Sequence, residues 1–240
     1  MTGSKRQCII FSLAYFNAGD GKMKNAKTRN LISLAMNLAT FVLVLISILW
    51  FFSEAAAGRG IGNMGTSGTG CFVFFTNDSN ILAALVALII VPFNIKSIIS
   101  GKDEIPVWAL TLKMIGTAAV TLTMMVVVLF LGPTQGYGIM FAGVCLWLHL
   151  ICPLLAIISF CFFERGMQIT KKRLLWTLAP TFIYGTVYLI NVVFAKVWPD
   201  FYGFNIGGFW YISYCVLPIV TYLFALCLRA MHNKLDKVAA

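Results

Sequence analysis

The chain has 240 residues, of which 60% are hydrophobic and only 11% charged, and its formal net charge is +10. Soluble domains contain about 25% charged residues, so this composition excludes an ordinary soluble protein and indicates an integral membrane protein. The basic balance does not require a nucleic-acid partner, because attraction to anionic lipid head groups explains it.

Six apolar segments follow one another, each long enough to cross a hydrocarbon core of about 30 Å, which takes ~20 helical residues. Their runs are continuous rather than alternating, which indicates helices. The predicted fold is therefore all-α, a polytopic membrane bundle of six transmembrane helices over residues 30–228. The predicted spans are 30–53, 72–95, 107–131, 141–163, 174–194 and 207–228.

The basic residues predict the orientation, because cytoplasmic loops are rich in Lys and Arg. With both termini in the cytoplasm, 15 of the 18 basic residues lie inside, and the outer loops hold only Arg59 and Lys196. Lys113 lies within the third span, from which its long side chain can snorkel to the inner surface. The tail 229–240 is then a basic cytoplasmic segment.

The basic segment 1–29 has two interpretations. Lys5 and Arg6, followed by the apolar stretch 8–16, imitate a secretory signal peptide. Cleavage near Ala18 would leave four basic residues on the outer side, against the charge rule. We therefore prefer a short amphipathic helix that lies on the inner leaflet.

The first outer loop is rich in glycine and contains Gly60-x-Gly62-x-x-Gly65, the letters of a dinucleotide fingerprint. That fingerprint needs a strand before it and a helix after it. Here a membrane helix precedes it, so a mobile loop or lid is the better interpretation. The last outer loop is aromatic and includes Trp198 and Tyr202, which are typical of an interfacial belt or, alternatively, form the rim of a lipid entrance.

The second span opens with polar residues, which are costly in lipid when they lack partners. On a helix, Thr76, Ser79 and Asn80 share one face, whereas Asp78 points roughly opposite. Such a stripe lines an interior cavity or holds helices together by hydrogen bonds. A further alternative is that Asn77 or Asp78 caps a helix that starts later.

His149 is the only histidine within a predicted span, and Pro153 follows it by four residues. Proline lacks an N–H, so the carbonyl of His149 loses its usual donor and the helix is expected to bend there. His149 enters from the outer side and can approach Thr76, although Thr76 lies shallower when both are counted from their span starts. The structural alternative is a core histidine with satisfied hydrogen bonds.

A threonine and a histidine in one bundle suggest a nucleophile and its base, because a neutral imidazole can remove the hydroxyl proton. The resulting oxyanion needs hydrogen-bond donors. The sequence offers four candidate donors without choosing among them. They are Ser79, Asn80, Tyr188 and Asn191.

A metal site is not expected, because a catalytic zinc needs three protein ligands. Glu164 is predicted at the inner boundary beside Arg165, as a solvated or paired charge. His232 is predicted in the cytoplasmic tail, on the far side of the membrane from His149. We expect no cofactor.

At these residues the chain resembles the androgen-induced-gene-type integral membrane hydrolases and their bacterial six-span relatives. That family has Phe-x-Thr at the start of one span, often extended to Phe-Thr-x-x-Ser-Asn, and a histidine in a later span followed within about one turn by proline. The segment 198–202 is similar, less cleanly, to the family's aromatic, proline-containing segment before the last span. The matching residues are Phe74, Phe75, Thr76, Ser79, Asn80, His149 and Pro153.

The resemblance implies a threonine nucleophile at Thr76, a histidine partner at His149 and a multi-pass protein of a bacterial cell membrane. Characterised animal members hydrolyse fatty acid esters of hydroxy fatty acids. This chain differs from them in its basic N-terminal extension, its glycine-rich first outer loop and its missing second aromatic-proline step. Those differences concern the substrate more than the catalytic pair.

Three hypotheses follow. The first is a hydrolase or acyl transferase that acts on lipidic esters among the membrane lipids. The second is a non-enzymatic transporter or lipid-binding protein that uses the same polar pocket; only Asp78 is a candidate intramembrane charge, which weighs against an ion-coupled carrier. The third is a structural subunit in which Thr76 and His149 merely bridge helices.

Overall fold

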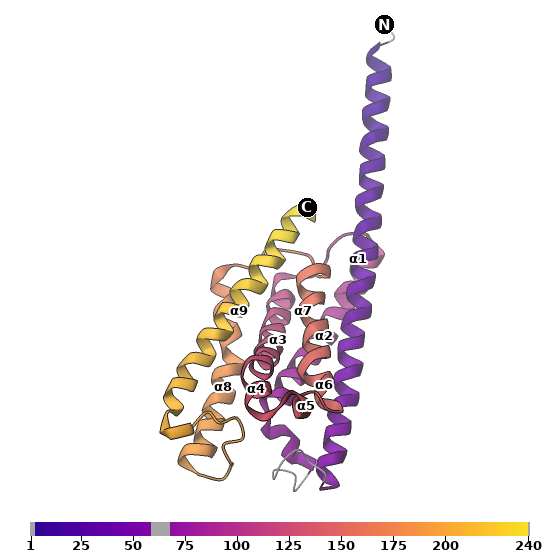
Figure 1. The fold of residues 1–240 in the computed structure, drawn as a ribbon. Helices are drawn as coiled ribbons and strands as arrows, with labels where there is room; N and C mark the ends of the chain where they lie inside the picture. Colours follow the sequence, from indigo (N-terminus) through magenta and orange to yellow (C-terminus); the bar gives the residue numbers. More distant parts are fainter. Residues whose placement is uncertain (1–2, 59–67, 240) are drawn as a thin grey trace.

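The computed structural model describes residues 3–58 and 68–239, so the glycine motif at 60–65 lies outside the described residues. Six helical segments are long and apolar enough to cross a membrane, which confirms the predicted all-α six-span bundle (Figure 1). The segments run Asn25–Ala56, Phe75–Ser100, Val107–Gln135, Val144–Phe163, Lys171–Phe194 and Trp210–Leu235.

Helix α1 (Gly3–Ala56) joins the segment 1–29 to the first span without a break. Its first half projects beyond the bundle, at the end where the C-terminus also lies (Figure 1). The structure therefore has one long helix in place of the separate short helix expected, and its contact with the inner leaflet stays a prediction. Helix α9 (Trp210–Ala239) likewise carries the last span into the segment 229–240.

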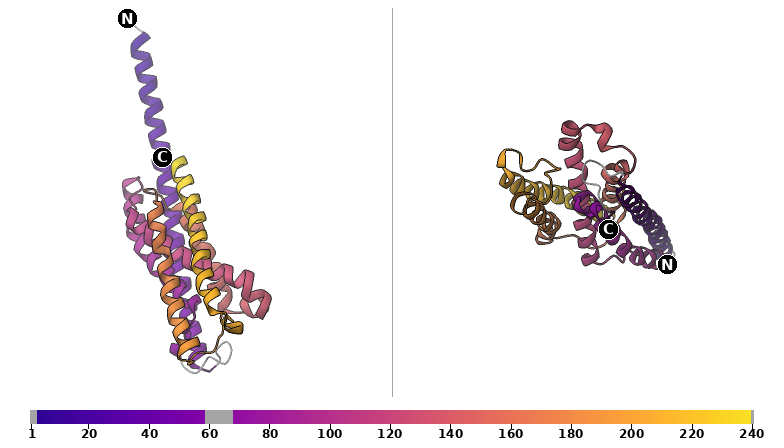
Figure 2. Two further views of the ribbon diagram at one scale, coloured as in Figure 1. Left: turned by 90° about the vertical axis from the view of Figure 1, so that its left-hand side faces the viewer. Right: turned by 90° about the horizontal axis from the view of Figure 1, so that it is seen from below.

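Helix α3 (Val107–Val126) lies at the centre and contacts α2 (Phe75–Ser100), α7 (Cys152–Ile158), α8 (Leu178–Leu189) and α9. Small residues allow this approach: a Cβ added at Gly116 would lie only 2.7 Å from a Val86 methyl carbon. Helix α1 and the α8–α9 pair lie on opposite flanks (Figures 1 and 2). The interior around α3 is therefore closed on two sides.

Short helical turns complete the spans and their connections. The 3₁₀ turns are η1 (Gly68–Val73), η5 (Lys171–Thr177) and η7 (Ile206–Gly208). The π-helical turns are η2 (Val127–Leu131), η3 (Trp147–Ile151), η4 (Ser159–Phe163) and η6 (Ile190–Phe194). The remaining α-helical turns are α4 (Gly132–Gln135), α5 (Tyr137–Met140) and α6 (Val144–Leu146).

The fourth span is irregular where the sequence predicted a bend. Pro153 has no N–H to offer the carbonyl of His149, and the preceding turn η3 is π-helical, with the amide of Cys152 bonded to the carbonyl of Trp147. Before it, the chain turns at Gly136 and Gly143, whose φ angles of 100° and 53° favour glycine. These turns fold the connection 132–143 back over the amino-terminal end of the fourth span.

Candidate active site at the end of the bundle opposite the termini

The first turn of α2 carries Thr76, because the helix begins at Phe75. The extended residue Phe74 precedes it without a side-chain cap. The prediction that Asn77 or Asp78 caps a later start is therefore wrong; the Asn77 amide instead donates to the Cys71 carbonyl at 2.5 Å. The hydroxyl of Tyr202 accepts a hydrogen bond from the Phe75 amide at 3.0 Å and takes over the capping role.

The side chains of Thr76 and His149 lie together, with 3.4 Å between the threonine Oγ1 and the histidine Nε2. The other ring nitrogen, Nδ1, lies 2.6 Å from the Met140 carbonyl oxygen. A carbonyl only accepts hydrogen bonds, so Nδ1 carries the proton and the Nε2 lone pair faces Thr76. The Met140 carbonyl thus orients the imidazole as an acidic side chain does in a serine-protease triad.

A cavity of about 290 Å³ borders this pair. His149 is buried in its wall, whereas Thr76 is half-buried. The cavity wall combines apolar side chains with a few polar ones. It includes Phe51, Phe74, Gln135, Met140, Phe201 and Tyr202.

Tyr202, predicted at the entrance, lies beside the nucleophile candidate. Its hydroxyl accepts a hydrogen bond from the Phe75 amide, and its side chain lines the same two cavities as Thr76. Burial raises the pKa of Tyr202 to about 12, so its phenol is protonated at neutral pH. Sequence reasoning missed this donor because the aromatic loop has the composition of an interfacial belt.

The aromatic loop folds inward around Asp200. Its carboxylate accepts a hydrogen bond from the Tyr188 hydroxyl at 2.6 Å and from the amides of Phe204 and Asn205 at 2.9 Å each. The Tyr202 ring then packs against Phe204, with 5.1 Å between centroids. These contacts hold the loop over the amino-terminal end of α2.

Two of the predicted oxyanion donors bind elsewhere. The Asn80 amide nitrogen donates to the carbonyls of Thr76 and Leu148, at 2.7 and 2.9 Å, so both of its hydrogens are used. The Ser79 hydroxyl lies 2.8 Å from the hydroxyl of Thr123 on α3. Neither side chain lines the 290 Å³ cavity.

The other two predicted donors are also committed to partners. Tyr188 donates to Asp200. The Asn191 amide donates to the Val187 carbonyl at 2.8 Å, one turn back along its own helix. Both side chains therefore have other partners in this structure, and their assignment as oxyanion donors stays a prediction.

The remaining pocket candidates are separated from the pair. Asp78 and Trp198 line a different groove of about 430 Å³, together with Ser79 and Ile183. Pro153 is buried below η3, where it shapes the helix rather than the cavity wall. The prediction that Asp78 points away from Thr76 agrees with this arrangement.

No family model, curated protein or solved structure matches the chain. The resemblance to the membrane hydrolases therefore depends on the motif residues alone. Two of those residues, Thr76 and His149, are the ones that the structure brings together.

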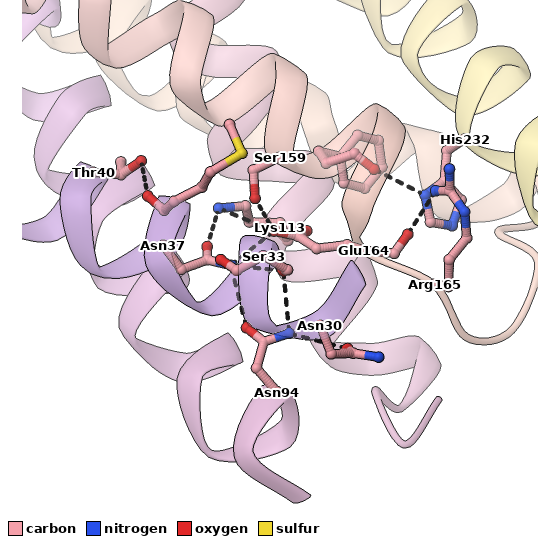
Figure 3. Close-up of polar contacts among 12 residues, drawn as sticks. Asn30, Ser33, Asn37, Thr40, Asn94, Lys113, Ser159, Glu164, Arg165 and His232 are labelled. Atoms are coloured by element: carbon pink, nitrogen blue, oxygen red, sulfur yellow. Dashed lines mark hydrogen bonds and ion pairs between the residues drawn. The ribbon is translucent and has the colours of Figure 1, made fainter. Parts of the chain in front are cut away.

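A second polar cluster, which the sequence analysis did not predict, lies in the half of the bundle that holds the termini (Figure 3). Lys113 Nζ and Glu164 Oε1 are 3.5 Å apart, with 1% and 0% of the side chains exposed. Asn37 joins both, since its Oδ1 accepts from Lys113 at 2.5 Å and its amide donates to Glu164 at 3.0 Å. The expectation that Lys113 snorkels to the surface is therefore wrong, whereas Glu164 directly follows the fourth span and is a paired charge, as expected.

His232 is fully buried and does not lie in a solvated tail. Its ring stacks on Phe160 at 4.8 Å, and its Nδ1 lies 3.2 Å from the Phe160 carbonyl oxygen (Figure 3). This packing follows from the continuation of α9 past residue 228 against the fourth span. Within the described ranges, no group of three His, Cys, Asp or Glu side chains is arranged to hold a metal ion.

Proposed function

We propose that the protein is an intramembrane hydrolase of lipidic esters, or an acyl transferase that uses the same acyl-enzyme. One observation carries the proposal: Thr76 Oγ1 lies 3.4 Å from a His149 Nε2 whose lone pair is directed by the Met140 carbonyl. The proposed setting is a bacterial cell membrane, with both termini cytoplasmic and the site near the outer surface.

In the first half-reaction, Thr76 Oγ1 attacks the ester carbonyl carbon while its proton passes to His149 Nε2. The tetrahedral intermediate collapses, the carbon–oxygen bond to the alcohol breaks, and His149 gives its proton to the leaving alcohol oxygen. An acyl ester on Thr76 remains. Water, or a second alcohol in a transferase, then attacks that ester, with His149 taking its proton and returning it to Thr76.

The developing oxyanion needs donors already in place. Tyr202 supplies a protonated phenol in the wall of the same two cavities as Thr76. The amino end of α2 adds the positive end of the helix dipole at the same position. Both features support acyl transfer at Thr76 over a purely structural role for its hydroxyl.

A fluorophosphonate probe on the purified protein tests the proposal. We expect labelling of the wild type, mapped to Thr76 by mass spectrometry, and none in Thr76→Ala or His149→Ala. Thr134→Ala is a matched control, because this exposed threonine bonds only within its own turn. Equal labelling of all four proteins contradicts the proposal.

The second candidate function, an ion-coupled transporter, is favoured by the buried Lys113–Glu164 pair, since intramembrane charges often mark ion or proton pathways. Neither residue lines the cavities around Thr76. Counterflow assays in proteoliposomes separate the two functions, because a transporter moves solute in the Thr76→Ala variant and a hydrolase has no such activity.

A further inference from the structure

Thr76 and Tyr202 stand between two cavities of different character. The 290 Å³ cavity includes His149 and the polar side chain of Gln135. On the other side of Thr76 lies a narrow cavity of about 60 Å³ between α3, α8 and α9, which does not reach His149. Its wall is largely apolar and includes Leu122, Val126, Val127, Leu131, Gly185 and Leu217.

A second space lies beside the narrow cavity, between α8 and α9. This space of about 40 Å³ shares Gly185, Tyr188, Phe204 and Leu217 with the narrow cavity and extends to Trp210. These two helices form one flank of the bundle, which faces lipid in a membrane (Figures 1 and 2). We call the two spaces together the α8–α9 corridor.

Gly185 keeps the corridor open. A Cβ added there would meet nothing closer than the Tyr214 ring, at 3.6 Å, which is an ordinary contact. Alanine therefore fits, whereas a branched side chain at this position projects into the space between the helices. The chain thus offers both a blocking substitution and a smaller one for comparison at one residue.

The reaction chemistry determines which part of an ester lies on which side of Thr76. His149 Nε2 must protonate the leaving alcohol oxygen, so the alcohol part lies in the cavity that contains His149. The acyl carbon bonded to Thr76 Oγ1 then directs its chain to the opposite side. That side is the apolar α8–α9 corridor, which suits a linear hydrocarbon chain.

We propose that the α8–α9 corridor binds the acyl chain of the ester, which enters between α8 and α9. The larger cavity binds the alcohol part. This inference rests on the proposed hydrolase function, and it specifies the site that holds the acyl chain and the path by which the chain reaches Thr76.

The first test uses full-length protein and p-nitrophenyl esters that differ only in acyl length, from acetate to palmitate. We expect Gly185→Leu to lower kcat/KM for palmitate by at least about tenfold, as steric exclusion from an apolar pocket does, and to leave acetate nearly unchanged. Gly185→Ala should lower the palmitate rate less than Gly185→Leu does, and Thr134→Ala, which lies outside the corridor, should behave as the wild type for every ester. An equal loss for all chain lengths, or no loss for palmitate, overturns the inference.

The second test does not need turnover. A non-hydrolysable long-chain amide with a terminal diazirine is photo-crosslinked to Thr76→Ala protein and the sites are mapped. We expect adducts on corridor residues such as Leu217 and Trp210, and their loss when Gly185→Leu is added. Adducts confined to lipid-facing Ile183 and Ile219, which are 67% and 60% exposed, overturn the inference.

The two tests separate failure of the corridor from failure of the hydrolase. Thr76-dependent hydrolysis with adducts only on the lipid-facing surface leaves the hydrolase and removes the corridor. Corridor adducts in a protein that hydrolyses no ester remove the hydrolase and retain a chain-binding site between α8 and α9.

Discussion

Replacement of Lys113 by methionine should destabilise the bundle strongly, because it leaves the carboxylate of Glu164 buried without its ammonium partner. At the observed separation of 3.5 Å, the attraction between two unit charges is about 5 kcal/mol at an effective dielectric constant of about 20. Removal of one partner of a buried pair costs about 3–5 kcal/mol. We expect Lys113→Met to lose an amount in this range.

The Glu164→Gln variant and the double variant complete a thermodynamic cycle. Glutamine retains an oxygen that can accept from Ser159, whose hydroxyl lies 2.6 Å from Glu164 Oε1 in the wild type. In the double variant neither member of the pair is left buried without its partner, so its loss should be smaller than the sum of the single losses by at least about 2 kcal/mol. Reversible unfolding in mixed detergent micelles, followed by circular dichroism, measures all four proteins.

Additive losses below about 1 kcal/mol for each single variant would refute this reasoning, because they would mean that the pair contributes little. Fluorophosphonate labelling per folded molecule should not change, since the pair lies far along the bundle from Thr76. A variant with full stability but no solute transport in proteoliposomes would instead favour the transporter.

Three further outcomes are expected. Tyr202→Phe should lower kcat by about 10²-fold with little change in KM, as the loss of one oxyanion donor does. An equal loss in Thr76-independent background hydrolysis would contradict the role of Tyr202 as an oxyanion donor. Asn80→Ala should destabilise the protein by about 1–3 kcal/mol in chemical unfolding, because the buried Leu148 carbonyl loses its donor; unchanged stability would contradict the bond. If the tail is cytoplasmic, green fluorescent protein fused after Ala240 should fluoresce, and alkaline phosphatase fused at the same position should be inactive. The reverse result would invert the topology.

The spans and the contact between Thr76 and His149 could be predicted from the sequence for related reasons. A helix that lies in lipid is apolar along its length, so each span appears in the sequence as a continuous apolar run. Lipid also forces isolated polar groups such as Thr76 and His149 to face the interior. Pro153 marked the position at which the fourth span departs from a regular α-helix. These are local signals, which do not depend on the partner that each group finds.

The choice of hydrogen-bond partner could not be predicted, because it depends on how distant segments meet. Tyr202 lies beside Thr76 only because Asp200 folds the aromatic loop inward. An aromatic composition at an outer loop is equally typical of a membrane interface. The aromatic composition of this loop therefore did not distinguish an interfacial belt from a wall of the candidate active site.

A polar face of α1 is the sequence signal for the buried charge pair. Asn30, Ser33 and Asn37 are spaced by three and four residues and so share one face of α1, within an otherwise apolar span. A polar face within lipid needs partners on a neighbouring helix. This need for partners indicates that a charged group lies against α1. The position of Lys113 near the end of its span gives no such indication.

The arrangement also gives the Ser-Asn part of the Phe-Thr-x-x-Ser-Asn motif a physical reason. Asn80 holds the carbonyl of Thr76, one turn earlier on α2, and the carbonyl of Leu148, the neighbour of His149. One amide thereby fixes the register between the two helices that carry the nucleophile and base candidates. Ser79 fixes the same turn of α2 to Thr123 on α3. Because a 3.4 Å contact tolerates little sliding between helices, Ser79 and Asn80 act as positioning residues, which agrees with their absence from the wall of the 290 Å³ cavity.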